Sequence, residues 1–108
     1  MYRRPESVLV VVYTKDLKIL VIKRTDPFPC WQSITGSLNN DEKKYDAALR
    51  ELQEETGLTN EGIMISTGIY RTFTIDKRWK HKYDNNTKEN IEYEFYYELK
   101  RPHKIKLN

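Results

Sequence analysis

The chain has 108 residues, a length that suits one domain and leaves no room for two. Its 38% hydrophobic content and formal net charge of +3 are ordinary for a soluble globular protein. No apolar run is long enough to span a membrane, and the start of the chain lacks the apolar core of a signal peptide.

The net charge and the cysteine content indicate which partners and which cellular compartment to expect. A net charge of +3 is much smaller than that of a typical nucleic-acid-binding arm, and such a mild excess is ordinary for a soluble protein. Basic side chains around a site would also suit a polyphosphate substrate. The single cysteine, Cys30, cannot form an internal disulfide, which suits a reducing compartment. We therefore expect a cytoplasmic protein without a nucleic-acid partner, and homo-oligomer formation stays open.

Strands are predicted before any helix. The β-branched run 7–14 predicts a buried strand, and residues 17–24 predict a second strand after a turn at 15–16. Two prolines break the segment 25–29, because proline cannot donate to a strand ladder. Residues 31–35 then predict a short strand.

One helix is predicted next. Good N-cap residues stand at Asn39, Asn40 and Asp41, and Gly57 is a natural C-terminal stop because glycine adopts the left-handed conformation cheaply. The sequence therefore predicts a helix over residues 42–56. At about 100° per residue, its packing stripe comprises Tyr45, Ala48, Leu49 and Leu52.

More strands are predicted after the helix. Residues 63–75 indicate one long or two short strands, bent at Gly68, and the polar segment 76–90 indicates a loop with a turn at 84–86. The alternation over 92–99 predicts a strand whose inner face carries three aromatic side chains, Tyr93, Phe95 and Tyr97.

Three glutamates share one face of the predicted helix. With Glu51 as origin, Glu54 lies about 60° to one side and Glu55 about 40° to the other. Like charges at this spacing repel by a few tenths of a kcal/mol per pair, which a hard cation such as Mg²⁺ or Mn²⁺ would relieve. Taken alone, however, the three residues are better explained by a solvated acidic face with Arg50 pairing at i, i+4.

The wider pattern favours the cation. The sequence runs from Gly36 through five residues to Glu42, and through seven more to Arg50-Glu51-Leu52-Gln53-Glu54-Glu55-Thr56-Gly57-Leu58. This segment resembles the signature of the Nudix hydrolases at every defining position. The resemblance implies an α/β fold, namely an α/β/α sandwich with a mixed β-sheet, and metal-dependent hydrolysis of a diphosphate bond.

The resemblance also implies roles for individual residues. Glu51 and Glu55 would be metal ligands, Glu54 a ligand or water-orienting base, and the Gly36 carbonyl would complete a site for Mg²⁺ or Mn²⁺. Arg50 would orient these acids. Glu42 falls about 180° from Glu51 on the helical wheel and resembles the structural glutamate of the family.

A narrower resemblance is to the dihydroneopterin triphosphate pyrophosphatase branch. It is carried by residues 3–13, by Phe28-Pro-Cys-Trp-Gln-Ser-Ile-Thr-Gly-Ser37, and by the segments 81–83 and 90–92. It implies cleavage of a pterin or purine triphosphate such as dATP to the monophosphate and pyrophosphate, for folate synthesis. Candidate substrate contacts are Arg4, Arg24, Trp31, Gln32, Thr35, Arg71 and Lys82, although surface charge, core packing or backbone hydrogen bonding explains each alone.

The chain ends at Asn108, where the branch continues with a further glutamate, another strand and a closing helix. We therefore expect a single domain over residues 1–108 that is incomplete at its C-terminus and leaves an apolar patch on one sheet face. Two alternatives to a pyrophosphohydrolase follow: a non-catalytic nucleotide-binding module and an inactive fragment. Nucleic-acid binding, resting only on the net charge, is a third.

Overall fold

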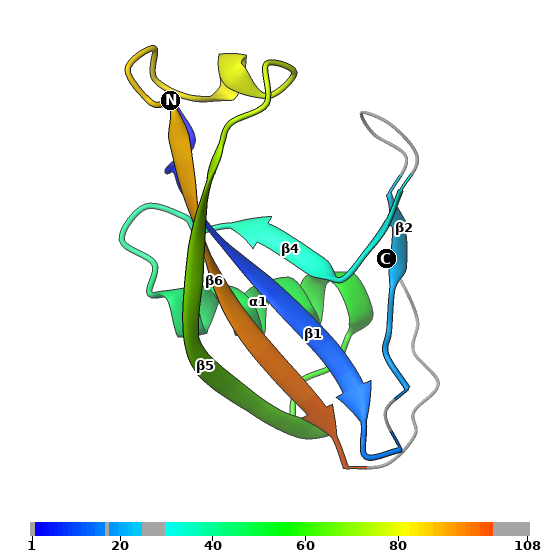
Figure 1. The fold of residues 1–108 in the computed structure, drawn as a ribbon. Coiled ribbons are helices and arrows are strands. Elements are labelled where there is room, and N and C mark those ends of the chain that lie inside the picture. The colour runs from blue at the N-terminus through cyan, green and yellow to red at the C-terminus, as the bar shows by residue number, and fades with distance from the viewer. Residues whose placement is uncertain (1, 17, 25–29, 101–108) are drawn as a thin grey trace.

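A mixed four-stranded sheet with one α-helix against it forms the body of the protein. The computed structural model describes residues 2–16, 18–24 and 30–100, except the side chains of residues 23, 24 and 30–32. Within this part the larger sheet has the strand order β4 (Ile34–Ser37), β1 (Glu6–Thr14), β6 (Glu89–Leu99) and β5 (Gly62–Thr74). A separate two-stranded sheet pairs β2 (Ile22–Arg24) with β3 (Cys30–Gln32). Helix α1 (Lys44–Thr56) lies behind the larger sheet in Figure 1. The predicted α/β fold with a mixed sheet is confirmed.

The larger sheet is built around β1 (Glu6–Thr14), as its β-branched run predicted. Its neighbours are β4 (Ile34–Ser37), which is antiparallel, and β6 (Glu89–Leu99), which is parallel. The outer strand β5 (Gly62–Thr74) pairs antiparallel with β6. The predicted bend in β5 is present: the register shifts between Ser66 and Tyr70, and Gly68 has a φ of 77°.

Two strand predictions need correction. The strand predicted over 17–24 shrinks to β2 (Ile22–Arg24), preceded by one isolated bridge between Tyr13 and Ile19. The partner, β3 (Cys30–Gln32), has only three residues, so only three residues of β2 can pair with it. The strand predicted over 31–35 is interrupted at Ser33, and its second half joins the larger sheet as β4.

Helix α1 (Lys44–Thr56) begins two residues later than predicted. Its N-cap is Lys43 in an extended conformation without a side-chain cap, so the predicted capping by Asn39, Asn40 or Asp41 is wrong. Asp41 instead adopts a left-handed φ of 64° in the preceding turn. The predicted stop is confirmed: Gly57 has a φ of 76°, and its N–H donates to the Gln53 carbonyl at 2.8 Å.

The core lies between α1 and the sheet. Leu52, Ala47 and Ala48 are fully buried, and opposite them lie Val8, Val10, Val12, Phe95 and Tyr97. Tyr45, predicted in the packing stripe, is 45% exposed, and the small Ala47 packs into the core instead. Tyr45 keeps an edge contact with the Phe95 ring at 6.2 Å. Phe95 and Tyr97 are buried and Tyr93 is half-buried, which confirms the predicted inner face of β6.

The sheet face opposite α1 carries exposed apolar side chains. Ile63, Ile65 and Tyr96 are 53%, 40% and 38% exposed, and Ile65 stands opposite Tyr96 in the register. These residues agree with the apolar patch expected on one face of the sheet. No helix among the described residues is long and apolar enough to cross a membrane.

The core predicts a large difference between two truncations. Leu52→Ala should lower the free energy of unfolding by about 2–4 kcal/mol, because the packed helix cannot close the cavity. Ile63→Ala, which removes a half-exposed aliphatic side chain, should cost less than about 1 kcal/mol. Urea unfolding followed by circular dichroism measures both. Equal effects would show that α1 does not seal the core.

Candidate functional site

Three glutamates project from α1 at different depths. Glu51 is buried, Glu55 is half-buried and Glu54 is exposed. Burial raises the pKa of the Glu51 carboxyl, a hydrogen bond from Arg50 opposes that rise, and the negative charges of Glu54 and Glu55 add to it. Glu54 and Glu55 are therefore close enough for their charges to repel that of Glu51, which is the most deeply buried of the three.

Glu51 is wedged between its helix and β4. A Cβ atom placed on Gly36 would lie 2.0 Å from Glu51 Cδ, well inside any real contact distance. Glycine at position 36 is therefore required by the close approach of the carboxylate rather than by its own backbone conformation. Gly36 and Glu51 are 15 positions apart in the sequence, and the packing of α1 on β4 brings them together.

Arg50 is the hub of the polar contacts around this face. Its Nε and Nη2 donate to the two carboxylate oxygens of Glu42 at 2.8 and 3.0 Å, a bidentate pair. Its Nη1 donates to Glu51 Oε1 at 2.8 Å and more weakly to Glu54 at 3.3 Å. Nη2 also donates to the Ser37 carbonyl at 2.9 Å. The hydrogen bonds to Glu42, Glu51 and Glu54 raise the pKa of Arg50 above its already high ordinary value.

Glu42 belongs to the scaffold of the site. It precedes α1, and its carboxylate accepts from Arg50 and from the backbone N–H of Asn39 at 2.9 Å. These donors lower the pKa of Glu42 and hold it ionised. The structural role implied by the family resemblance therefore has a direct geometric explanation.

Arg4 fastens the N-terminal segment to the loop before α1. Its Nη1 donates to the carbonyls of Asn39 and Glu42 at 3.0 and 2.8 Å, and its Nε donates to Glu6 at 2.6 Å. Glu6 also accepts from the Tyr93 hydroxyl at 2.6 Å. Arg4, Glu6, Glu42 and Tyr93 line an open surface cavity whose walls include none of the three helix glutamates. Arg4, a candidate substrate contact, is thus occupied in linking backbone segments.

The other candidate substrate contacts are scattered. Thr35 alternates with the inward-facing Ile34 and Gly36, so it lies on the sheet face away from α1. Arg71 lies on that same face, paired with Glu92 at 2.8 Å and Glu94 at 2.5 Å. The structure therefore does not bring these two together with the helix glutamates. The side chains of Arg24, Trp31 and Gln32 lie outside the described residues.

Lys82 lies in a short basic turn between β5 and β6. The turn contains the 3₁₀ helix η1 (Lys80–Lys82), and Lys82 Nζ sits over the Trp79 ring, 4.3 Å from its centroid. The run 77–82 has four lysine and arginine residues and no acid, a signal present in the sequence although only Lys82 was singled out as a candidate. The structure thus adds a basic element that the sequence reasoning largely missed.

The donor set on α1 fits a hard divalent cation by its chemistry. Carboxylate and carbonyl oxygens are the ligands that Mg²⁺ and Mn²⁺ prefer, and the repulsion around Glu51 is of the kind a cation relieves. In the described part of the chain, however, no group of three or more histidine, cysteine, aspartate or glutamate side chains is arranged to hold a metal ion. Arg50 holds Glu51 and Glu54 here, so metal binding requires the side chains to turn.

Comparison with known proteins relates the whole chain to one family. The sequence matches the NUDIX domain over residues 3–108. It is 35% identical to the dihydroneopterin triphosphate diphosphatase of Haemophilus influenzae and 34% identical to that of Escherichia coli K12. These alignments cover 93% and 85% of this chain but only 66% and 64% of the relatives, so the chain spans slightly less than two thirds of their length.

A solved structure extends the likeness to the fold. The E. coli dihydroneopterin triphosphate pyrophosphohydrolase superposes with a TM-score of 0.88 at 32% identity. That superposition covers 99% of this chain and 76% of the E. coli chain. The arrangement of the sheet and α1 is therefore shared with that enzyme.

The close approach of Glu51 to Gly36 predicts that substitutions at these two positions have coupled effects on the free energy of unfolding. Gly36→Ala should destabilise the protein by about 1–3 kcal/mol, because the new methyl group displaces the Glu51 carboxylate. In a Glu51→Ala background the same change should cost much less, because the displaced group is gone. Urea unfolding of the four proteins in the cycle gives the coupling free energy. Simple additivity would show that the two residues do not meet.

The contact between Glu6 and Arg4 predicts a pH-dependent contribution to stability. The Tyr93 hydroxyl and Arg4 lower the pKa of Glu6 in the folded state. The stabilisation is therefore complete above the unfolded pKa of about 4.3 and is lost as the pH falls through the lower folded pKa. Glu6→Gln should lower the melting temperature at pH 7, and the gap from wild type should shrink below about pH 4. A gap that stays constant down to pH 3 contradicts this assignment.

Proposed function

Because the chain belongs to the Nudix family, we propose that it is a pyrophosphohydrolase that cleaves a nucleoside or pterin triphosphate to the monophosphate and pyrophosphate. The observation that carries this proposal is the carboxylate face of α1, where Arg50 clamps the buried Glu51 against Gly36. The repulsion among Glu51, Glu54 and Glu55 suits a site that binds a divalent cation together with an anionic substrate.

Dihydroneopterin triphosphate is the substrate that we put first. Relatives of that specificity are 35% and 34% identical over most of this chain, and the solved enzyme shares the fold. A purine triphosphate such as dATP is the second choice. The reaction would be a cytoplasmic step of folate synthesis, and the single cysteine suits that compartment.

The site would hold Mg²⁺, or Mn²⁺, through Glu51, Glu54, Glu55 and the Gly36 carbonyl. Once bound, the cation neutralises phosphate charge and lowers the pKa of a coordinated water. Glu51 is the most constrained of these groups, since β4 and Arg50 fix its position. Glu54, whose side chain is 55% exposed, contacts Arg50 at 3.3 Å and lies at the solvent side of this face, where a water molecule is at hand.

Glu54 and Arg50 have different roles in the proposed reaction. Glu54 orients the attacking water and accepts its proton, while the water oxygen forms a new bond to phosphorus and the anhydride P–O bond breaks. Pyrophosphate leaves with the electrons of that bond, and the monophosphate keeps the water oxygen. Arg50 does not touch substrate in this scheme: it positions Glu51 and Glu54 from behind.

The proposal predicts loss of turnover on removing one helix carboxylate. Glu55→Gln should lower kcat/KM on the order of 100-fold or more in the presence of Mg²⁺, because a charged oxygen ligand is lost. The matched control is Glu89→Gln, an exposed glutamate at the start of β6, which should leave turnover unchanged. Pyrophosphate release is measured on dihydroneopterin triphosphate, dATP and the other nucleoside triphosphates.

Two results would count against this function. A folded sample that binds neither Mg²⁺ nor Mn²⁺ by calorimetry would remove the basis for metal-dependent hydrolysis. Binding of the triphosphates without pyrophosphate release by the wild type would favour a nucleotide-binding module instead.

A further inference from the structure

The β5–β6 connection carries a concentrated positive charge. Residues 77–82, Lys-Arg-Trp-Lys-His-Lys, contain four cationic side chains, one histidine and no acid. We propose that this basic turn, residues 77–82, binds the phosphate chain of the triphosphate substrate from the side opposite the helix glutamates. The inference rests on the proposed function for its substrate, and it assigns a role to residues beyond the Nudix signature.

Within the described residues, one of the four cationic side chains of the basic turn has a carboxylate partner. Arg78 is paired with Asp76 at 2.7 Å, which lowers the pKa of that aspartate. Lys80 Nζ donates to the Thr87 carbonyl, and Lys82 lies over the Trp79 ring. Among the described residues, no carboxylate lies within ion-pair distance of Lys77, Lys80 or Lys82. Neighbouring cations without counterions favour an anionic ligand.

The turn is held in place rather than free to move with its ligand. The backbone N–H groups of Lys82 and Tyr83 donate to the Trp79 and Lys80 carbonyls at 2.9 and 3.1 Å. The Tyr83 side chain is buried beneath the turn, and Ile75, also buried, donates to the Lys88 carbonyl at 2.9 Å. Preorganised cations lose less conformational entropy when an anion binds than flexible ones do.

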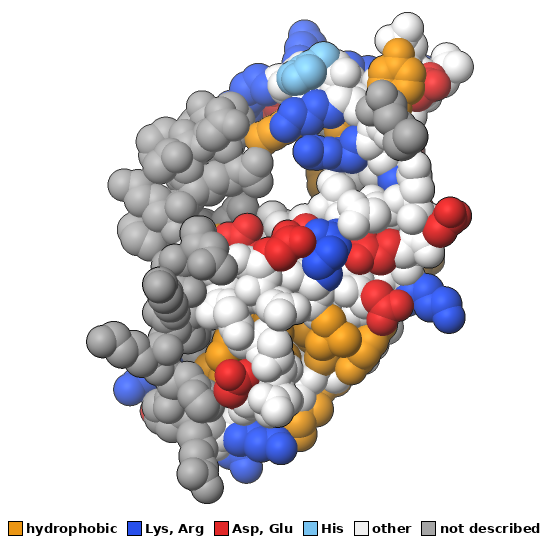
Figure 2. Space-filling view, turned by 180° about the vertical axis from the view of Figure 1, so that it is seen from behind, with side chains coloured by type: hydrophobic (Ala, Val, Ile, Leu, Met, Phe, Trp, Pro, Cys, Tyr) orange, Lys and Arg blue, Asp and Glu red, His pale blue; other side chains and the backbone are white. Residues whose placement is uncertain are grey.

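The basic turn faces the carboxylate side of the protein. Figure 2 shows a hollow with basic side chains above it and, below it, a row of acidic side chains with a basic one among them. Hydrogen bonds of the N-terminal segment connect the basic turn to the acidic side chains below the hollow. The Arg3 N–H donates to the Lys82 carbonyl at 2.7 Å, and the neighbouring Arg4 binds the Glu42 carbonyl. Glu42 in turn pairs with Arg50, which holds Glu51.

The opposed charges favour a short phosphate chain over a nucleic acid. A long polyanion laid across this face would run past the acidic row and be repelled there. A linear triphosphate can instead place one part against the basic turn and another at the metal-binding carboxylates. The basic turn thereby adds affinity that increases with the number of phosphate groups.

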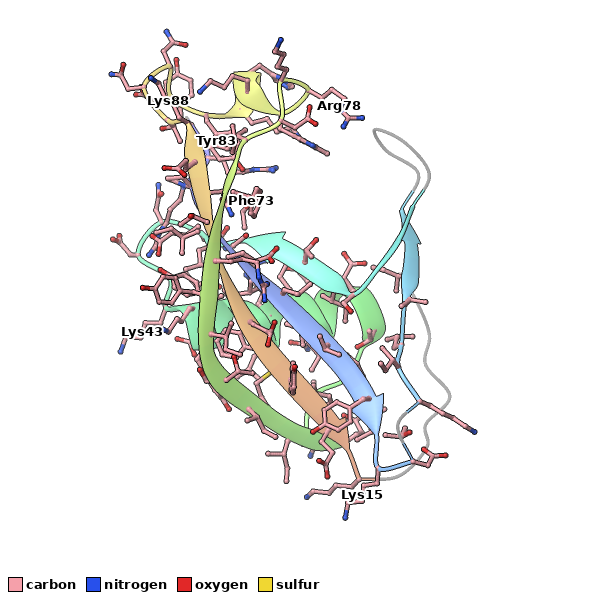
Figure 3. All side chains as sticks on the ribbon, viewed as in Figure 1. Lys15, Lys43, Phe73, Arg78, Tyr83 and Lys88 are labelled. Carbon is pink, nitrogen blue, oxygen red and sulfur yellow. The ribbon has the colours of Figure 1, made fainter. Side chains whose placement is uncertain are left out.

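The test measures binding of inorganic triphosphate by calorimetry, in EDTA and at low ionic strength, so that neither metal nor turnover contributes. Lys77→Gln/Lys82→Gln should weaken binding about tenfold, while Lys77→Arg/Lys82→Arg should retain it. The matched control is Lys15→Gln/Lys100→Gln, which likewise removes two lysines, both of them exposed and outside the basic turn. Lys15 lies at the opposite end of the molecule from Arg78 in Figure 3. Wild type should also bind triphosphate more tightly than pyrophosphate and orthophosphate.

The outcomes separate this inference from the proposed function. Weaker triphosphate binding in the glutamine pair alone supports the basic turn, even if no substrate releases pyrophosphate. Unchanged triphosphate affinity and unchanged KM in that pair overturn it, even if hydrolysis is fully active. Tighter binding to an unphosphorylated single-stranded oligonucleotide than to triphosphate, lost in the same pair, overturns it in favour of a nucleic-acid site.

Discussion

The ion pairs and hydrogen bonds of Arg50 organise the site. One guanidinium holds Glu42 in front of the helix, Glu51 beneath it, Glu54 on its outer face and the Ser37 carbonyl at the end of β4. Its planar set of donors can serve four acceptors from three segments, which an ammonium group cannot match geometrically. Because Glu51 is buried, the positive charge also offsets a desolvation cost that the carboxylate would otherwise bear alone.

The same network continues beyond the helix. Glu42 is linked through its backbone to Arg4, Arg4 to Glu6, and Glu6 to Tyr93 on β6. The preceding residue, Arg3, holds the turn that contains Lys82. A displacement of the N-terminal segment would therefore reach both the carboxylate face and the basic turn. The two halves of the proposed phosphate site are thus supported by one set of contacts, which favours a fixed geometry between them.

The basic turn and the helix carboxylates place opposite charges on two sides of one hollow, whereas the sheet face away from α1 carries exposed apolar side chains beside the ion pairs of Arg71. Ile63, Ile65 and Tyr96 remain exposed on that face, while the α1 face carries the packed core and the candidate site. Arg71 and Thr35 also lie on that face, away from the helix glutamates. The solved E. coli enzyme, which superposes with a TM-score of 0.88, shares the sheet and α1. These are the elements that position the helix glutamates.

Local patterns in the sequence determined the elements that depend on neighbouring residues. The β1 run, the bend at Gly68, the stop at Gly57 and the common face of Glu51, Glu54 and Glu55 all follow from preferences within a few positions. The tertiary structure decided the contacts between distant positions. Arg50 lies 8 residues from Glu42 and 13 from Ser37, and Arg4 lies 38 from Glu42. Such pairings gave Arg4 a structural task and required glycine at 36. They could not be read from the sequence, because they depend on which surfaces pack together and not on local conformation.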